Sequence, residues 1–151
     1  MALSGHLVDT GILLRISRRD DADYRIVEVA LGLLDQAGTK LYYTHQNIAE
    51  VWNVCTRPIA HNGFGLSIAK TVREIKAIER TMTLLTDGAA VYQEWRRLVE
   101  PHSVSGKQVH DARLVAAMIV HGVTHLLTLN TVDFKRYPEI TAVHPRSVAE
   151  K

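Results

Sequence analysis

The chain has 151 residues, of which 46% are hydrophobic and 23% charged, with 9 Gly, 4 Pro and a single Cys. This composition excludes a disordered, collagen-like or disulfide-stapled chain and is typical of a globular domain. The formal net charge of +2 gives no overall basic character, so any function on nucleic acid must come from the local placement of charge.

The length predicts one domain spanning residues 1–151, because a chain of this size buries enough surface for one core and too little for two. Cys55 has no partner for an internal disulfide, and the sequence contains neither a signal peptide nor a run of about 18 apolar residues. We therefore expect a cytoplasmic protein that does not associate with membranes.

Short apolar runs alternate with amphipathic segments along the chain, which predicts an α/β fold with a central, mainly parallel sheet of four to five strands. Polar loops are expected at residues 58–65 and 101–107. In chain order, the first half is predicted to contain a strand at 6–8, a helical turn at 12–14, a helix from Asp21 to about 37, a strand at 41–44 and a helix at 46–55. The second half is predicted to contain a helix at 66–80, a strand at 82–85, a helix from Asp87 to about 98, a buried helix at 108–121, and strands at 125–129 and 140–143.

Local signals set several details of these elements. Asp20 and Asp21 are expected to cap the helix that follows them. Ile68 is expected on the apolar face of helix 66–80, and Cys55 on the core face of helix 46–55, as a buried and inert thiol. Phe134 is expected to anchor the loop after the fourth strand in the core.

Most carboxylates fit helix caps or solvated faces, but four have more suggestive positions. Asp9 ends the first strand, at the edge where open α/β sheets bind ligands. Glu50 lies beside the core face of its helix, Asp111 begins the buried helix, and Asp133 follows the fourth strand. Considered singly, each also fits a structural interpretation as a cap, a turn residue or a solvated side chain.

Considered together, the four carboxylates predict a metal site. If the strands run parallel, the acids converge at one sheet edge, where they raise each other's pKa unless a divalent cation neutralises them. A ligand set of oxygens alone favours Mg²⁺ or Mn²⁺ over zinc. Such an ion can generate hydroxide and stabilise an in-line displacement at phosphorus.

Four segments around these acids resemble the four motifs of PIN-domain ribonucleases, especially the VapC-like toxins of prokaryotic toxin-antitoxin modules. The segments are VDTGILL at 8–14, NIAEV at 47–51, VHDARLVAA at 109–117 and LTLNTVDF at 127–134. Each is a weak signal alone, whereas their order and spacing over residues 6–145 make the set more specific. One departure is Gly11, where the family more often has Asn or Ser.

The resemblance implies a PIN-like three-layer α/β/α fold and a Mg²⁺- or Mn²⁺-dependent endoribonuclease that leaves a 5′-phosphate and a 3′-hydroxyl. By position, it implies metal-binding and catalytic roles for Asp9, Glu50 and Asp111, with Asp133 as a more variable fourth acid. It further implies a homodimer and a cognate antitoxin protein. Supporting polar groups in the pocket would be Thr10, Thr128 and Asn130.

Contacts with the RNA substrate are less well defined by the sequence. Arg15, Arg113 and Lys107 lie near the motif segments and are candidates for phosphate contacts, against the alternative of ordinary surface ion pairs. Three tyrosines are expected to be exposed and either to stack on bases or to pack against the protein, namely Tyr42, Tyr43 and Tyr92.

Two other functions stay open. A catalytically silent PIN-like module that binds RNA or protein would be marked by loss of one of the acids, and all four are present. A receiver-like signalling domain normally has two adjacent acids after its first strand, whereas Asp9 stands alone. His110 and His121 are expected to be structural because no cluster of Cys and His residues with zinc-ligand spacing is present.

Overall fold

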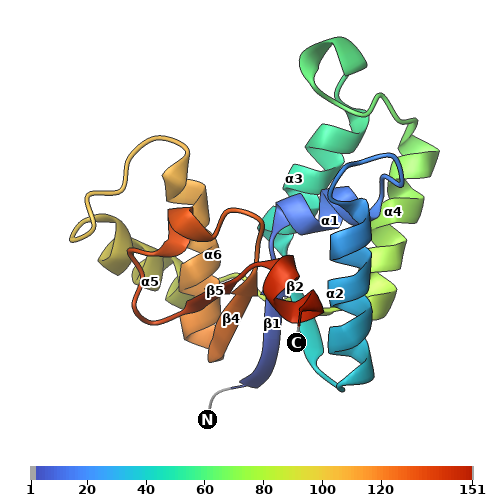
Figure 1. The fold of residues 1–151 in the computed structure, drawn as a ribbon. Helices are drawn as coiled ribbons and strands as arrows, with labels where there is room; N and C mark the ends of the chain where they lie inside the picture. The colour runs from blue at the N-terminus through green and yellow to red at the C-terminus, as the bar shows by residue number, and fades with distance from the viewer. Residues whose placement is uncertain (1–2, 151) are drawn as a thin grey trace.

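The computed structural model describes residues 3–150, and within them five parallel strands form one sheet in the order β3-β2-β1-β4-β5 (Figure 1). All four neighbouring pairs are parallel, as the alternation of apolar and amphipathic segments predicts. The strands are β1 (Leu3–Val8), β2 (Lys40–Thr44), β3 (Thr83–Leu85), β4 (Val123–Leu127) and β5 (Thr141–Val143).

Helices cover both faces of the sheet. Figure 1 shows α5 and α6 on one face and α1 to α4, with α7, on the other, which is the predicted three-layer α/β/α arrangement. The helices are α1 (Thr10–Ile16), α2 (Tyr24–Gln36), α3 (His45–Thr56), α4 (Ile68–Thr81), α5 (Ala89–Val99), α6 (Gln108–His121) and α7 (Pro145–Ala149), with short 3₁₀ turns η1 (Ile59–His61) and η2 (Thr131–Phe134).

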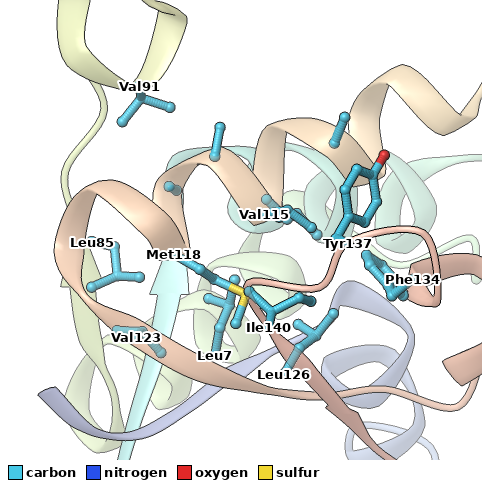
Figure 2. Close-up of a cluster of buried hydrophobic side chains, with 14 of the residues drawn as sticks. Leu7, Leu85, Val91, Val115, Met118, Val123, Leu126, Phe134, Tyr137 and Ile140 are labelled. Carbon is cyan, nitrogen blue, oxygen red and sulfur yellow. The ribbon is translucent and has the colours of Figure 1, made fainter. Parts of the chain in front are cut away.

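The two faces follow from the alternation of side chains along each strand. Leu7 and Leu126 point into a core beneath α5 and α6, which also holds Met118, Phe134 and Tyr137 (Figure 2). Their neighbours Val8 and Leu127 belong to the opposite core, with α1 to α4. Strands buried on both faces explain why the sequence shows continuous apolar runs rather than alternation.

The sheet order creates a switch point between β1 and β4. From β1 the chain moves outward to β2 and β3, and then returns to β4 on the other side of β1. Open α/β sheets bind ligands where the strand order reverses, at the carboxyl ends of the strands. Asp9 follows β1 at this point, and its backbone N–H donates to the carbonyl of Leu127, the last residue of β4.

Several sequence predictions need correction. The fourth strand begins at Val123 rather than at residue 125. The second helix begins at Tyr24 after Asp23, so Asp20 and Asp21 do not cap it directly; Asp21 instead accepts from the N–H of Asp23. Ile68 is 58% exposed because it occupies the first turn of α4, before that helix packs on the core.

Two tyrosines expected at the surface are buried. Tyr42 and Tyr43 are 3% and 7% exposed, because β2 is an interior strand covered on both faces. Tyr92, the third, is 61% exposed, as predicted. Phe134 and Cys55 are buried, as their positions in the pattern predict.

Helix ends match their local sequence signals. The residue after α6, Gly122, adopts a φ of 72°, the left-handed conformation that glycine accepts most readily. Arg57 closes α3 in an extended conformation because it precedes Pro58.

Among residues 3–150, none of the helices has both the length and the apolar character needed to cross a bilayer.

Candidate functional site

Asp9 is held in place by both of its carboxylate oxygens. It is the N-cap of α1, where Oδ1 accepts the N–H of Thr10 at 2.9 Å. Oδ2 accepts the hydroxyl of Thr128 at 2.7 Å. The pKa of Asp9 is raised overall. Burial is the largest cause and the charges of Glu50 and Asp133 add to it, while the two hydrogen bonds lower the pKa.

Glu50 is connected to Asp9 through Thr10. The Thr10 hydroxyl donates to Oε1 of Glu50 at 3.3 Å, and Nε2 of Gln46 donates to the same oxygen at 3.1 Å. Thr10 is itself oriented by Asn47, whose Nδ2 donates to the Thr10 hydroxyl at 3.0 Å. The start of α1 and the first turns of α3 therefore form one hydrogen-bonded unit.

Asn47 is completely buried, and this polar core residue was not predicted from the sequence. Its Oδ1 accepts the N–H of Thr44 at 2.8 Å and the Thr44 hydroxyl at 3.0 Å, while its own N–H donates back to that hydroxyl. This is a capping box at the start of α3. The signal was present as Thr44-x-x-Asn47, an amide variant of the usual pattern.

The charges of the other three carboxylates affect the ionisation of Asp111. It lies in the first turn of α6 and is partly buried. Its pKa is raised to about 6, first by burial and then by the negative charges of Asp9, Asp133 and Glu50, while Arg136 lowers it. Asp133, on η2, is exposed. The four acids come from four different elements and face a common region.

A groove of ≈ 750 Å³ opens at this region, between α3 and the start of α6. We call it the acidic groove. Gln46 spans it, because its Nε2 donates both to Glu50 and to the carbonyl of His110, the latter at 2.9 Å. Its lining includes Gln46, Glu50, Asn53, Lys107, His110, Asp111, Arg113 and Asp133.

The carboxylate oxygens of Glu50, Asp111 and Asp133 suit a hard divalent cation, and the neighbouring carboxylate of Asp9 adds to this donor set. His110 also lines the groove, and it is exposed. Oε1 of Gln46 is buried and makes no protein hydrogen bond, so one further oxygen is available. Within residues 3–150, no three His, Cys, Asp or Glu side chains are close enough to form a compact metal cluster. Mg²⁺ tolerates this spacing, since it keeps several waters and usually binds through one or two carboxylates.

The supporting polar groups differ in how they meet the acids. Thr10 and Thr128 are buried and bond directly to Glu50 and Asp9. Asn130 contributes through its backbone, whose N–H donates to the Thr128 hydroxyl at 3.1 Å. The side chain of Asn130 is exposed.

The three basic candidates do not form one set. Lys107 and Arg113 line the acidic groove, and Arg113 also pairs with Asp87. Arg15 lies near the end of α1, where it pairs with Asp21 at 3.6 Å, and it is not part of the groove lining. A further cation, Arg136, was not predicted; it influences Asp111 and donates to Gln108 at 2.5 Å.

The two histidines singled out in the sequence lie apart from the acids' hydrogen bonds. The ring of His110 is exposed, and its carbonyl accepts the bond from Gln46. The Nε2 atom of His121 lies 2.8 Å from the carbonyl oxygen of Thr86, which ties the end of α6 to the segment after β3.

Comparison with known protein families identifies the family to which this α/β fold belongs. The family model of the PIN domain matches residues 6–140, which is most of the chain and includes all four acids. The chain belongs to the PIN-domain family. No curated protein sequence is significantly similar to it.

Solved structures of other PIN-domain proteins share the fold at low sequence identity. VapBC2 from Rickettsia felis, bound to a promoter DNA fragment, is 15% identical with a TM-score of 0.69, covering 92% of this chain and 97% of that one. VapBC-1 from nontypeable Haemophilus influenzae is 13% identical with a TM-score of 0.68, covering 93% and 98%. VapC20 from Mycobacterium tuberculosis, a toxin that cleaves the sarcin-ricin loop, is 17% identical with a TM-score of 0.57, covering 81% and 87%.

Proposed function

We propose that this PIN-domain protein is an endoribonuclease that hydrolyses RNA phosphodiester bonds with the help of Mg²⁺ or Mn²⁺. The observation that carries the proposal is the gathering of four carboxylates near the switch point: Glu50, Asp111 and Asp133 line one groove, and Thr10 connects Glu50 to the adjacent Asp9. The raised pKa of Asp111 agrees with this, since burial and then the charges of the other three acids raise it. Four carboxylates that repel one another at the switch point of a sheet are costly in the apo protein. A divalent cation would offset that cost.

Asp9, Glu50, Asp111 and Asp133 would hold the cation. When bound, the ion would activate a water for attack at phosphorus and neutralise charge that develops on the phosphate oxygens. The protein's own contribution is orientation: Thr128 and the Thr10 amide fix both oxygens of Asp9, and Gln46 with the Thr10 hydroxyl fixes Oε1 of Glu50. Hydrolysis leaves a 5′-phosphate and a 3′-hydroxyl.

The RNA backbone would be held at the edge of the acidic groove. Lys107 and Arg113 line the groove next to Asp111, so they are placed to balance the charge of a phosphodiester that enters it. Arg15, outside this lining, is expected to contribute less and to serve its ion pair with Asp21.

We further propose that the protein is the toxin of a type II toxin-antitoxin pair, with a cognate antitoxin and a homodimeric state. The support is the resemblance to VapC-like toxins and the nature of the similar structures, which include a toxin-antitoxin complex from Klebsiella pneumoniae and VapBC2 from Rickettsia felis. A co-purification of this chain with the product of the adjacent reading frame tests the pairing.

RNA cleavage is the test of the enzymatic proposal. Purified protein is incubated with total cellular RNA and with labelled oligoribonucleotides, with Mg²⁺, with Mn²⁺ or with EDTA. Cleavage is expected only with a divalent ion and is expected to be lost in Asp9→Asn, while Asp35→Asn, an exposed acid of α2, cuts normally. Undiminished cutting by Asp9→Asn would reject the assignment, and a folded protein that binds RNA without cutting it under any of these conditions would favour the silent binding module.

A further inference from the structure

A second cavity lies beside the acidic groove and is built from aromatic rather than acidic residues. It has a volume of ≈ 570 Å³ and is lined by Asp87, Gly88, Tyr92, Trp95 and Arg113. We call it the aromatic pocket. Its volume falls within the range of about 300–1,000 Å³ that is usual for small-ligand sites.

The aromatic pocket and the acidic groove adjoin at one side chain. Arg113 lines both of them. A narrow crevice shares Gln46 with the groove and Asp87 with the pocket, and Arg113 lines it as well. The guanidinium of Arg113 therefore separates the two cavities and can contact a strand that reaches from one to the other.

The pocket offers an exposed ring on a fixed support. Tyr92 is 61% exposed on α5. Beside it, Trp95 is partly buried and held by a hydrogen bond of 2.9 Å from its Nε1 to the carbonyl of Val109, at the start of α6. The two rings are 6.2 Å apart between centroids and tilted by 31°.

The charged side chains of the pocket also suit a neutral planar group that is attached to a phosphate. Arg113 and Asp87 form an ion pair, which neutralises the carboxylate and fixes the guanidinium at the boundary with the groove. A Cβ atom added to Gly88 would meet no atom within 4 Å, so this side of the pocket is open. Aromatic faces and guanidinium planes are the groups on which proteins stack unpaired bases.

We propose that the aromatic pocket is a nucleobase subsite, in which Tyr92 stacks on an unpaired base of the RNA strand whose backbone enters the acidic groove, with Arg113 contacting the phosphate between the two. This inference rests on the proposed function for the class of polymer bound. It is independent of cleavage, because base stacking requires no metal ion. Stacking on a tyrosine is tolerant of base identity, so the subsite would anchor the strand without reading a sequence.

The first experiment measures RNA binding by fluorescence anisotropy with a fluorescein-labelled single-stranded RNA of mixed sequence, about 12 nucleotides long, which suits typical single-strand sites. Asp9→Asn is the background, and a gel confirms that the RNA stays intact. Adding Tyr92→Ala is expected to weaken binding about 5- to 100-fold, the range for loss of one stacked base. Tyr92→Phe is expected to restore it, because stacking needs the ring and not the hydroxyl.

The matched control is Gln93→Ala, an exposed neighbour on α5 that does not line the aromatic pocket. A second readout locates the contact: RNA that contains 4-thiouridine is photocrosslinked, and the crosslinked peptide is expected to contain Tyr92. Wild-type affinity in Tyr92→Ala, or a crosslink only to other segments, would overturn the subsite. So would a Tyr92→Ala variant that changes the sedimentation of the protein and not its affinity for RNA, since Tyr92 would then contact a second copy of the chain.

The outcomes separate this inference from the proposed function. Cleavage that depends on Asp9, combined with unchanged binding in Tyr92→Ala, would leave the nuclease standing and remove the subsite. Binding that depends on Tyr92 without any cleavage would leave the subsite standing and remove the nuclease.

Discussion

The hydroxyl of Thr128 donates a 2.7 Å hydrogen bond to Oδ2 of Asp9, joining residues 119 positions apart in the chain. The contact exists because β1 and β4 are neighbours in parallel, so the residues that follow them lie side by side. It means that the orientation of Asp9 depends on the end of β4 as well as on its own helix cap.

Removal of this hydrogen bond is the first prediction. Thr128→Val leaves Oδ2 of Asp9 without its donor, so the pKa of Asp9 rises further and its carboxylate becomes free to rotate. We expect RNA cleavage to fall about tenfold and the free energy of unfolding to fall by about 1.5–3 kcal/mol, typical of a lost hydrogen bond to a charged group. Initial rates and urea unfolding measure the two effects. Thr128→Ser retains the hydroxyl and should recover most of the activity; equal loss in both variants would contradict the role of the bond.

A second prediction concerns stability and pH in the absence of metal ions. The pKa of Asp111 in the folded protein is about 6, above its ordinary value of 3.8, so the folded state holds more protons between these values. The free energy of unfolding therefore decreases as the pH rises through this window, and the cost is complete above pH 6.

Asp111→Asn removes that cost. At pH 7 in EDTA we expect its Tm to exceed that of the unaltered protein by about 2–4 °C, equivalent to roughly 1 kcal/mol after allowance for the partial solvation of the carboxyl. At pH 4 the two melting curves should nearly coincide. Asp35→Asn controls for the loss of a carboxylate elsewhere. A lower Tm for Asp111→Asn at pH 7 would mean that Asp111 is stabilising and not crowded.

The pH profile of cleavage is a third prediction. Protons compete with the cation for Asp111, so cleavage at limiting Mg²⁺ should decline as the pH falls below about 6. Raising the Mg²⁺ concentration should move the midpoint of this decline to lower pH, because the cation then displaces the proton. Initial rates across pH 4.5–8 at two Mg²⁺ concentrations, roughly tenfold apart, measure both. A midpoint pH that does not change with the Mg²⁺ concentration would indicate a titrating group outside the cation site.

The fourth prediction tests the buried support beneath the site. Asn47→Ala removes the acceptor of the Thr44 amide and the donor to Thr10, at a position with no access to solvent. We expect the free energy of unfolding to fall by about 2–4 kcal/mol, since a cap is lost and buried polar groups are left unpaired. Asn53→Ala, on the exposed side of the same helix, should change it by no more than about 0.5 kcal/mol. A similar decrease in the free energy of unfolding in both variants would show that the hydrogen bonds of Asn47 do not stabilise the protein more than an exposed side chain of the same helix does.

The sequence was sufficient for the order of most strands and helices along the chain because those elements carry their own local signals; α7, at Pro145–Ala149, was not predicted. The helix at 108–121, for example, is apolar on nearly every side and ends at a glycine, and α6 has these bounds. The carboxylates were found because three of them follow a strand or begin a helix, positions at which a charge is not explained by a solvated face.

Other features depend on tertiary packing that no local pattern encodes. Tyr42 and Tyr43 were both expected to meet solvent, but β2 is covered on both faces. Asn47 is polar and fully buried because Thr44 and Thr10 satisfy its amide, and the second partner lies on another helix. The acids were expected to converge tightly. Glu50, Asp111 and Asp133 line one groove, and Asp9 acts on Asp111 through its charge without lining the groove. Within residues 3–150 the acids lack the compact grouping of a preformed metal cage.

Titration calorimetry with Mn²⁺ tests the central claim most directly, because it measures cation binding without RNA, an antitoxin or turnover. We expect saturable binding to the unaltered protein at pH 7, at least tenfold weaker binding in both Asp9→Asn and Asp111→Asn, and unchanged binding in Asp35→Asn. Equal Mn²⁺ affinity in all four proteins, or no binding to any of them, would contradict it.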